Sequence, residues 1–406
     1  MKHFTAISAC VTVLFLSGAV LAKPDKPEPT DPIFPPGGTK RVSDWIKELR
    51  TSDDLKTRQK ALVAMKVVGP KVPGVVVAVC GTMKQDKDVG MRIDAAQTLG
   101  QFAPPLGKSE PLIDTAEMVD SLQTVLAGDN KDAEERVREA AAASLGKMGT
   151  QVDKQSQAQA ALLAALKDKP SVQAAAAASI DVLVTPNEGV GYLGCGILAL
   201  DAGEPMLALL KDAGAPMQAR CSAARLVSKL KSLDGRISAL TDVLADDKND
   251  PQLRRTVADM LGRFRELAID AVPALGKALN DKNVDLRIDS GTALAQIANT
   301  PQGRRKVVEV LPEIRKALKD QDATVRNRAI DILARLESDG ADAVKDLIAC
   351  LKSESVIENR VAAIRVFGLI GPPAKEALDL LNGYKTSANP DVRKAAGEAI
   401  KKIEGS

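Results

Sequence analysis

The stretch from Ala271 to Ala298, AVPALGKALNDKNVDLRIDSGTALAQIA, decides the fold of this chain, because its pattern recurs along most of the sequence. Each half places apolar or small residues three and four apart, which is the spacing of one face of a helix. These residues are Val272, Leu275 and Leu279 in the first half, and Leu286, Ser290, Leu294 and Ile297 in the second. The polar segment 280–283 between them reads as a turn, so the stretch predicts an antiparallel pair of helices.

The arginine that follows the polar turn marks the same position in every copy of the pattern. The markers are Arg58, Arg92, Arg138, Arg220, Arg254, Arg287, Arg326, Arg360 and Arg393, with Gln173 in the one remaining slot. The shortest steps between successive markers are 33 or 34 residues, as from Arg58 to Arg92 and from Arg254 to Arg287. A period of this length is typical of a repeat whose unit is one helix pair.

The residues after each marker obey a fixed rule. Three residues on, the side chain is small or β-branched: Ala61, Ala95, Ala141, Ala176, Ala223, Val257, Ser290, Ala329, Ala363 and Ala396. Seven and ten residues on, the side chains are bulky and apolar, as in Leu145 and Met148 or Leu333 and Leu336. We therefore expect an all-α solenoid of about ten antiparallel helix pairs, in which each pair buries its apolar face against the next.

The repeats resemble HEAT repeats, in particular the short alanine-rich kind found in bilin lyases and deoxyhypusine hydroxylase. The segment LKDQDATVRNRAIDILARL, from Leu318 to Leu336, is similar to that family's consensus. The resemblance implies a right-handed α-α superhelix over residues 42–406. It also implies that the marker arginines form a structural ladder with turn aspartates of neighbouring repeats. It implies little about function, because such arrays serve both enzymes and scaffolds.

The N-terminus is organised differently. Residues 1–22 contain Lys2, an apolar core and the sequence Val20-Leu21-Ala22, which together indicate a secretory signal peptide cleaved after Ala22. The alternative, an uncleaved anchor, would need roughly 20 apolar residues, more than this core provides. Residues 23–41 are rich in proline and offer little to bury, so we expect a disordered linker there. The solenoid, residues 42–406, should then be exported, without stable membrane insertion.

Several kinds of chemistry are excluded by composition. The chain has one histidine, His3, and this residue lies inside the signal peptide. The processed chain therefore lacks imidazole bases and His-containing zinc sites. It also lacks the His-Glu pairs that hold the di-iron centre of deoxyhypusine hydroxylase. Paired carboxylates such as Asp246-Asp247 lie in or beside predicted turns and suit solvated positions. We expect no catalytic residue, no metal and no cofactor.

Two features of the middle of the chain invite functional interpretations. Cys195 and Cys221 are a candidate disulfide in an exported protein, although small apolar fillers on buried helix faces are the alternative for every cysteine. The segment 189–194 matches G-x-G-x-x-G but lacks the preceding strand that a dinucleotide site requires. We interpret it as a loop in the interruption 185–203, with Tyr192 and Leu193 at a partner-contact tip.

Charge is balanced along the chain. The formal net charge is +3 and aromatic residues make up 2% of the sequence, which argues against a nucleic-acid partner. Arginines are denser from Arg254 to Arg335 but alternate with acidic residues, so a local basic patch for an acidic partner or an anionic polymer stays open.

Two functions from different classes remain. The preferred one is a non-catalytic scaffold that binds another exported protein, of unknown identity, through its concave or loop surface. The alternative is a small-molecule-binding enzyme or chaperone resembling the bilin lyases, which would hold its ligand in a pocket with a thiol or carboxylate at its base, near Cys195.

Overall fold

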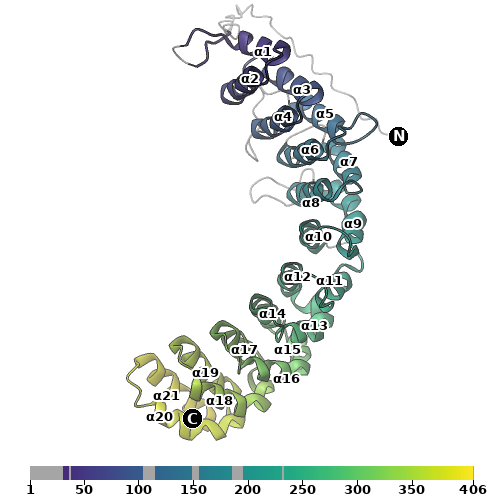
Figure 1. The fold of residues 1–406 in the computed structure, drawn as a ribbon. Coiled ribbons are helices and arrows are strands. Elements are labelled where there is room, and N and C mark those ends of the chain that lie inside the picture. Colours follow the sequence, from purple (N-terminus) through teal and green to yellow (C-terminus); the bar gives the residue numbers. More distant parts are fainter. Residues whose placement is uncertain are drawn as a thin grey trace, which may run out of the picture.

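The computed structural model describes residues 31–35, 38–103, 115–148, 155–184, 195–230 and 233–405. These residues form a curved stack of helix pairs and contain no strand beyond one isolated bridge. Figure 1 shows the stack as a single arc from α1 to α21. The predicted all-α solenoid is confirmed.

The helices that carry the marker residues line the inner side of the arc in Figure 1, and we call them the inner helices. They are α2 (Leu55–Val68), α4 (Val89–Phe102), α6 (Glu135–Met148), α8 (Pro170–Val184), α10 (Met217–Lys229), α12 (Pro251–Phe264), α14 (Val284–Ile297), α17 (Ala323–Leu336), α19 (Ile357–Ile370) and α21 (Pro390–Glu404). In the N-terminal half their outer partners are α1 (Val42–Thr51), α3 (Val75–Gln85), α5 (Thr115–Leu126), α7 (Gln155–Ala165), α9 (Cys195–Lys211) and α11 (Arg236–Ala245).

The outer layer changes character in the C-terminal half, where a 3-10 segment precedes the outer helix. These pairs of segments are η1 (Arg265–Ala271) with α13 (Val272–Ala278), η2 (Val308–Val310) with α16 (Leu311–Ala317), η3 (Glu337–Ala343) with α18 (Val344–Ser353), and η4 (Pro372–Ala377) with α20 (Leu378–Tyr384). An additional helix, α15 (Pro301–Val307), lies where the sequence suggested a small interruption. Proline at its first position and Thr300 as its N-cap favour this short helix.

Most inner helices begin at an aspartate or asparagine whose side chain accepts a hydrogen bond from a first-turn amide. Asp54 accepts from the Thr57 amide, and Asn283 accepts from the Leu286 amide. Asp88, Asp250 and Asp322 cap α4, α12 and α17 in the same way. These caps satisfy amides that have no partner within the helix and fix the start of each inner helix.

The core follows the repeat rule. All ten residues three positions after the markers are 0% exposed, and Leu145 and Leu333, seven positions after their markers, are fully buried as well. Inner helices approach closely where small residues meet. A Cβ atom added to Gly100 would lie 2.5 Å from Ser144 Oγ, and one added to Gly146 would lie 2.4 Å from Ser179 Oγ. Each pair is therefore packed against its neighbours at near-contact distance, which couples the repeats into one stack.

The N-terminal end differs from the predicted boundary at Val42. Ile33 and Arg41 form an antiparallel bridge, and the Trp45 indole Nε1 donates a 2.9 Å hydrogen bond to the Phe34 carbonyl. The Ser43 hydroxyl donates to the Asp31 carboxylate at 2.6 Å. The described residues between 31 and 41 thus fold back onto α1 instead of forming a free linker, because Trp45 supplies an apolar surface and a donor for them.

Candidate functional site

The turns that join the two helices of each pair lie along one edge of the arc, which we call the turn edge. The guanidinium of Arg138 shows its organisation. Its Nε and Nη2 atoms donate to the Asp168 carboxylate of the next pair at 2.8 and 2.7 Å. Its Nη1 atom donates to the Asp132 and Ala133 carbonyls of its own turn at 2.7 and 2.9 Å. One side chain therefore fastens its own turn and ties it to the next one.

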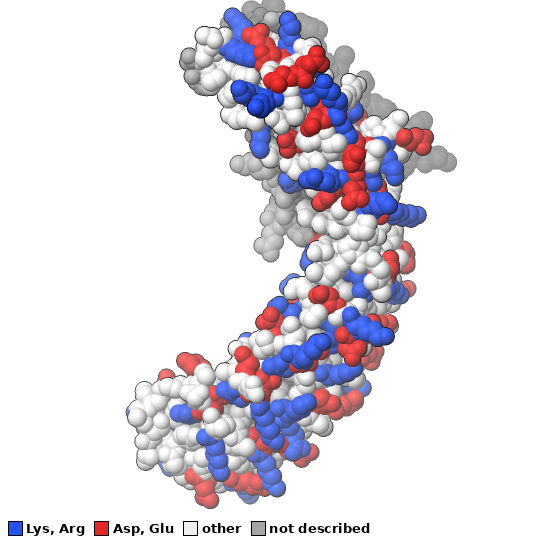
Figure 2. Space-filling model, in the orientation of Figure 1, with Lys and Arg blue, Asp and Glu red and all other residues white. Residues whose placement is uncertain are grey.

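The same link joins most successive turns. Arginine pairs with a turn residue of the following pair as Arg58 with Asp86, Arg92 with Asp132, Arg220 with Asn249, Arg254 with Asp281, Arg287 with Asp320 and Arg326 with Glu354. Figure 2 looks onto the turn edge, where blue and red atoms alternate along most of the arc, while the part between α8 and α10 is mainly white.

The hydrogen bonds between the partners of these pairs shift the pKa values of their side chains against the effect of burial. The Arg138 guanidinium holds the pKa of Asp168 below its usual range, and Asp168 in turn raises the pKa of Arg138. The side chain of Glu354 is 0% exposed, and its hydrogen bonds from Arg326 lower its pKa to about 2. Because both oxygens are also hydrogen-bonded, to the Val356 amide and the Asn359 side chain, Glu354 stays ionised although it is buried.

The link changes at the end of the array and at Gln173. Arg360 donates to the Glu354 carbonyl at 2.6 Å, and Arg393 donates to the Ser387 and Ala388 carbonyls, so both fasten only their own turns. Gln173 Nε2 donates to the Leu166 carbonyl, also in its own pair, at 2.8 Å. The chain of cross-links is therefore interrupted between α8 and α10.

The acceptor residues of these links were not singled out from the sequence. Asp86, Asp132, Asp281, Asp320 and Glu354 each lie six residues before the marker of their own repeat. Each also accepts the backbone amide two residues on, which holds the carboxylate in a fixed orientation. An acidic residue at this offset, in addition to the capping residue four before the marker, is the signal that identifies them.

Two columns of exposed residues on the first four inner helices carry a single charge. The positions five and nine residues after each marker lie opposite the buried stripe of an inner helix. On α2 to α8 these exposed residues are Val63, Val67, Gln97, Gln101, Ala143, Lys147, Ala178 and Val182, and we call this set the N-terminal concave surface. Val63 and Val67 are 61% and 64% exposed. A hollow of about 340 Å³ opens beside Gln97, Gln101 and Lys147, and the charged pair Arg136 and Glu139 also lines it.

At the same two positions, α10, α12 and α17 carry charges that are paired within the solenoid. Arg225 and Lys229 of α10 both contact the Asp181 carboxylate of α8 at 2.8 Å. In the arginine-dense region, Arg255 binds Asp285 and Asp289, Arg263 binds Asp259, Arg304 binds Glu337, and Arg335 binds Asp331. Most charges of the expected basic patch are thus neutralised within the solenoid, and the two halves of the concave face differ in character.

The cysteines that the structure describes are buried thiols. Cys80, Cys221 and Cys350 form no disulfide with one another, and burial raises the pKa of the Cys350 thiol to about 11. Cys221 Sγ accepts from the Thr256 hydroxyl at 3.7 Å. The side chain of Cys195 and the loop with Tyr192 and Leu193 lie outside the described residues, so the disulfide and the loop contact stay predictions.

Two further properties follow from the described part of the chain. It holds no group of three or more His, Cys, Asp or Glu side chains that could bind a metal ion. None of its helices combines the length and the apolar character that a membrane span requires.

Comparisons with protein-family models identify the repeats. A model of HEAT repeats matches residues 272–360, and a model of the PBS lyase HEAT-like repeat matches residues 137–168. The resemblance seen in the sequence is therefore confirmed. A search of curated protein sequences finds no match to this chain.

Solved structures share the fold at low sequence identity. An engineered protein is 20% identical with a TM-score of 0.57, and the match covers 89% of this chain and 98% of that one. Kap95p is 16% identical with a TM-score of 0.61, and the match covers 89% of this chain and 51% of that one. That structure concerns the effect of Kap95p binding on the switch loops of RanGDP. Yeast importin-beta (Kap95p) is 16% identical with a TM-score of 0.54, over 89% of this chain. The chain thus spans about half the length of these importin-beta chains, 51% and 50%.

Proposed function

We propose that this HEAT-like repeat protein is a non-catalytic scaffold that binds another protein along its N-terminal concave surface. In keeping with the signal peptide expected at residues 1–22, we place it in the cell envelope or outside the cell. Its solved neighbours include an importin-beta whose described action is on a protein, RanGDP.

One observation carries the choice of surface. At the positions five and nine after the markers, the first four inner helices carry one charge among eight exposed residues, whereas α10, α12 and α17 carry charges already paired with other side chains. Exposed valines cost free energy in water. Val67 and Val182 are 64% and 50% exposed, so burying the rest of either side chain against a partner would contribute about 1–2 kcal/mol. The side-chain amides of Gln97 and Gln101 supply hydrogen-bonding groups between them. This combination suits an uncharged segment of a partner with apolar anchors.

The test compares two surfaces that carry the same residue type. A photo-crosslinking amino acid is placed at Val67 or Val182 on the concave side, and at Val77 of the outer helix α3, which is 50% exposed. After irradiation in the native extract, the concave positions should yield the same cross-linked protein, and Val77 should not. Val67→Glu and Val182→Glu should weaken its capture, while Val77→Glu should not.

A second variant addresses the loop expected to contact the partner. Deleting residues 189–196 should reduce the yield of the cross-linked protein without changing helical content if Tyr192 and Leu193 contribute to binding. Equal cross-linking at all three valines, or turnover of a substrate by the processed chain, would contradict the proposed function.

A further inference from the structure

We propose that the turn between α9 and α10 binds an arginine side chain of a protein partner, in the place of the cross-linking arginine that this joint lacks. This inference rests on the proposed function, because it assumes that the chain binds a protein. It adds a second contact site on the turn edge, which would bind a guanidinium group.

Asp212 has the geometry of the carboxylates that accept an arginine at other turns. It directly follows α9, as Asp86 follows α3 and Glu354 follows α18. Its Oδ1 atom accepts the amide two residues on, Gly214, at 2.8 Å, just as Asp86 and Glu354 accept the corresponding amides at 2.9 Å. Asp86 and Glu354 each receive a guanidinium from the preceding inner helix. Asp212 is thus a cross-linking carboxylate by its place and its local hydrogen bonding.

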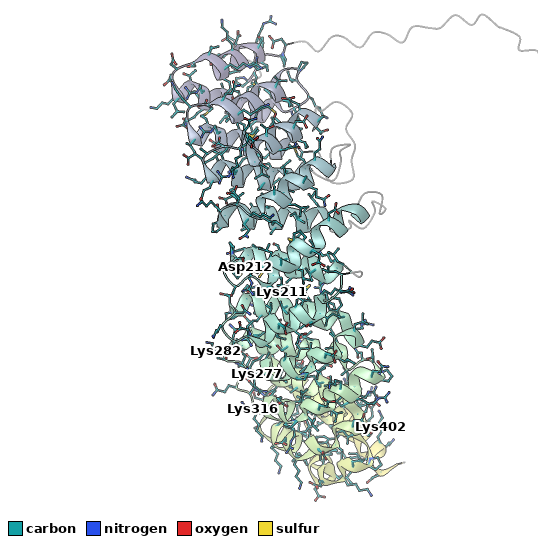
Figure 3. All side chains as sticks on the ribbon, turned by 90° about the vertical axis from the view of Figure 1, so that its right-hand side faces the viewer. Lys211, Asp212, Lys277, Lys282, Lys316 and Lys402 are labelled. Atoms are coloured by element: carbon teal, nitrogen blue, oxygen red, sulfur yellow. The ribbon has the colours of Figure 1, made fainter. Side chains whose placement is uncertain are left out.

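The preceding inner helix offers Asp212 no cation. Its marker position holds Gln173, whose amide nitrogen is used by the Leu166 carbonyl. Among the described residues, Asp212 is exposed and has no ion pair within the 4.0 Å that joins the other pairs. Figure 3 shows Asp212, with Lys211 beside it, on the turn edge near the middle of the arc.

A hollow of about 610 Å³ lies between these residues. Its lining is largely aliphatic and includes Leu163, Leu166 and Leu209, with Gln173 and Asp212 as polar groups. Aliphatic walls suit the methylene stem of an arginine, and a carboxylate suits its planar fork of donors. Lys167 also lines the hollow, and its side chain is exposed. The guanidinium of a bound arginine would therefore lie in the same hollow as this ammonium group.

The other joints show why arginine fits better than lysine. In the links from Arg58, Arg92, Arg138 and Arg326, both Nε and Nη2 donate to the two oxygens of one carboxylate. An ammonium group lacks this planar pair of donors, and citrulline keeps the shape of arginine but not its charge.

The experiment measures binding of the peptide acetyl-Leu-Arg-Leu-amide to the chain 23–406 by ligand-detected NMR titration. We expect the arginine peptide to bind at least about tenfold more tightly than the citrulline peptide, because a charge-assisted fork is lost in the latter. Asp212→Asn should remove most of this difference. Gln173→Arg, which supplies the missing guanidinium from within the chain, should abolish peptide binding.

Asp246→Asn is the matched control. Asp246 directly follows α11 and accepts the Lys248 amide at 3.0 Å, but Arg220 of the preceding inner helix donates to Asn249 instead. This variant removes the same charge from the same kind of turn and should leave peptide binding unchanged. Equal affinity for the arginine and citrulline peptides, or full binding by Gln173→Arg, would overturn the inference. Cross-linking at Val67 and Val182 would still report separately on the concave surface.

Discussion

The link between Arg326 and Glu354 offers a quantitative test of how the turns are held together. The pKa of Glu354 is about 2 in the folded chain, against 4.5 for an ordinary glutamate carboxyl. Each tenfold change in proton affinity corresponds to about 1.4 kcal/mol, so the ionised carboxylate stabilises the folded chain by roughly 3 kcal/mol at neutral pH. Because the folded pKa is the lower one, this contribution is complete above pH 4.5. It is lost as the pH falls from there toward 2.

Glu354→Gln removes the charge and keeps the shape. At pH 7 the variant should be less stable than the natural chain by about 3 kcal/mol, within the range for breaking a buried ion pair. The difference should shrink as the pH is lowered through 4 and should nearly vanish near pH 2, where Glu354 of the natural chain also becomes protonated.

A solenoid can unfold in parts, so the assay must be local. Hydrogen exchange of the amides in α17 and α19, measured from pH 7 to pH 2.5 and corrected for intrinsic rates, reports the free energy of opening at this joint. Asp259→Asn is the control, because Asp259 and its partner Arg263 are exposed and such pairs contribute about 0–1 kcal/mol. A destabilisation of Glu354→Gln that does not change with pH would refute the reasoning.

Three further predictions follow from packing and burial. Gly146→Ala would place a Cβ atom 2.9 Å from a Cα atom of α8 and should lower the melting temperature, since overpacking costs about 1–3 kcal/mol. At Gly397 a Cβ atom would have no atom within 4 Å, so Gly397→Ala should raise the melting temperature through its higher helix propensity. A shift of the same sign in both variants would contradict this reasoning. Native Cys350, with a pKa of about 11, should be alkylated at pH 8 at least about a hundredfold more slowly than in the unfolded chain, as measured by peptide mass spectrometry. Deletion of residues 23–41 should red-shift the fluorescence of Trp45, the one tryptophan, and an unchanged spectrum would show that this segment does not cover the ring.

Sequence alone predicted the helix pairs, their number and the inner faces. The reason is that burial of one stripe of a helix leaves a periodic record in nearby residues, such as Ala141, Leu145 and Met148 after Arg138. Export and the loop at Tyr192 and Leu193 stay predictions from sequence. The nine arginines were chosen as structural by resemblance, and the structure places seven of them against a side chain of the next pair.

Only the tertiary structure decided which residues meet across repeats. Arg92 and Asp132 are 40 residues apart. The offset of Asp132 from its own marker can be read from the sequence, but its contact with Arg92 depends on how one helix pair is set against the next. The same holds for Asp181, which forms ion pairs with two cations of α10. It also holds for the residues before Val42, whose hydrogen bonds are made to residues of α1. The similarity of Asp212 to the cross-linking carboxylates also becomes visible only when the turns are compared in space. Its distance in sequence from the marker of its repeat differs from theirs, while it accepts the amide two residues on as they do.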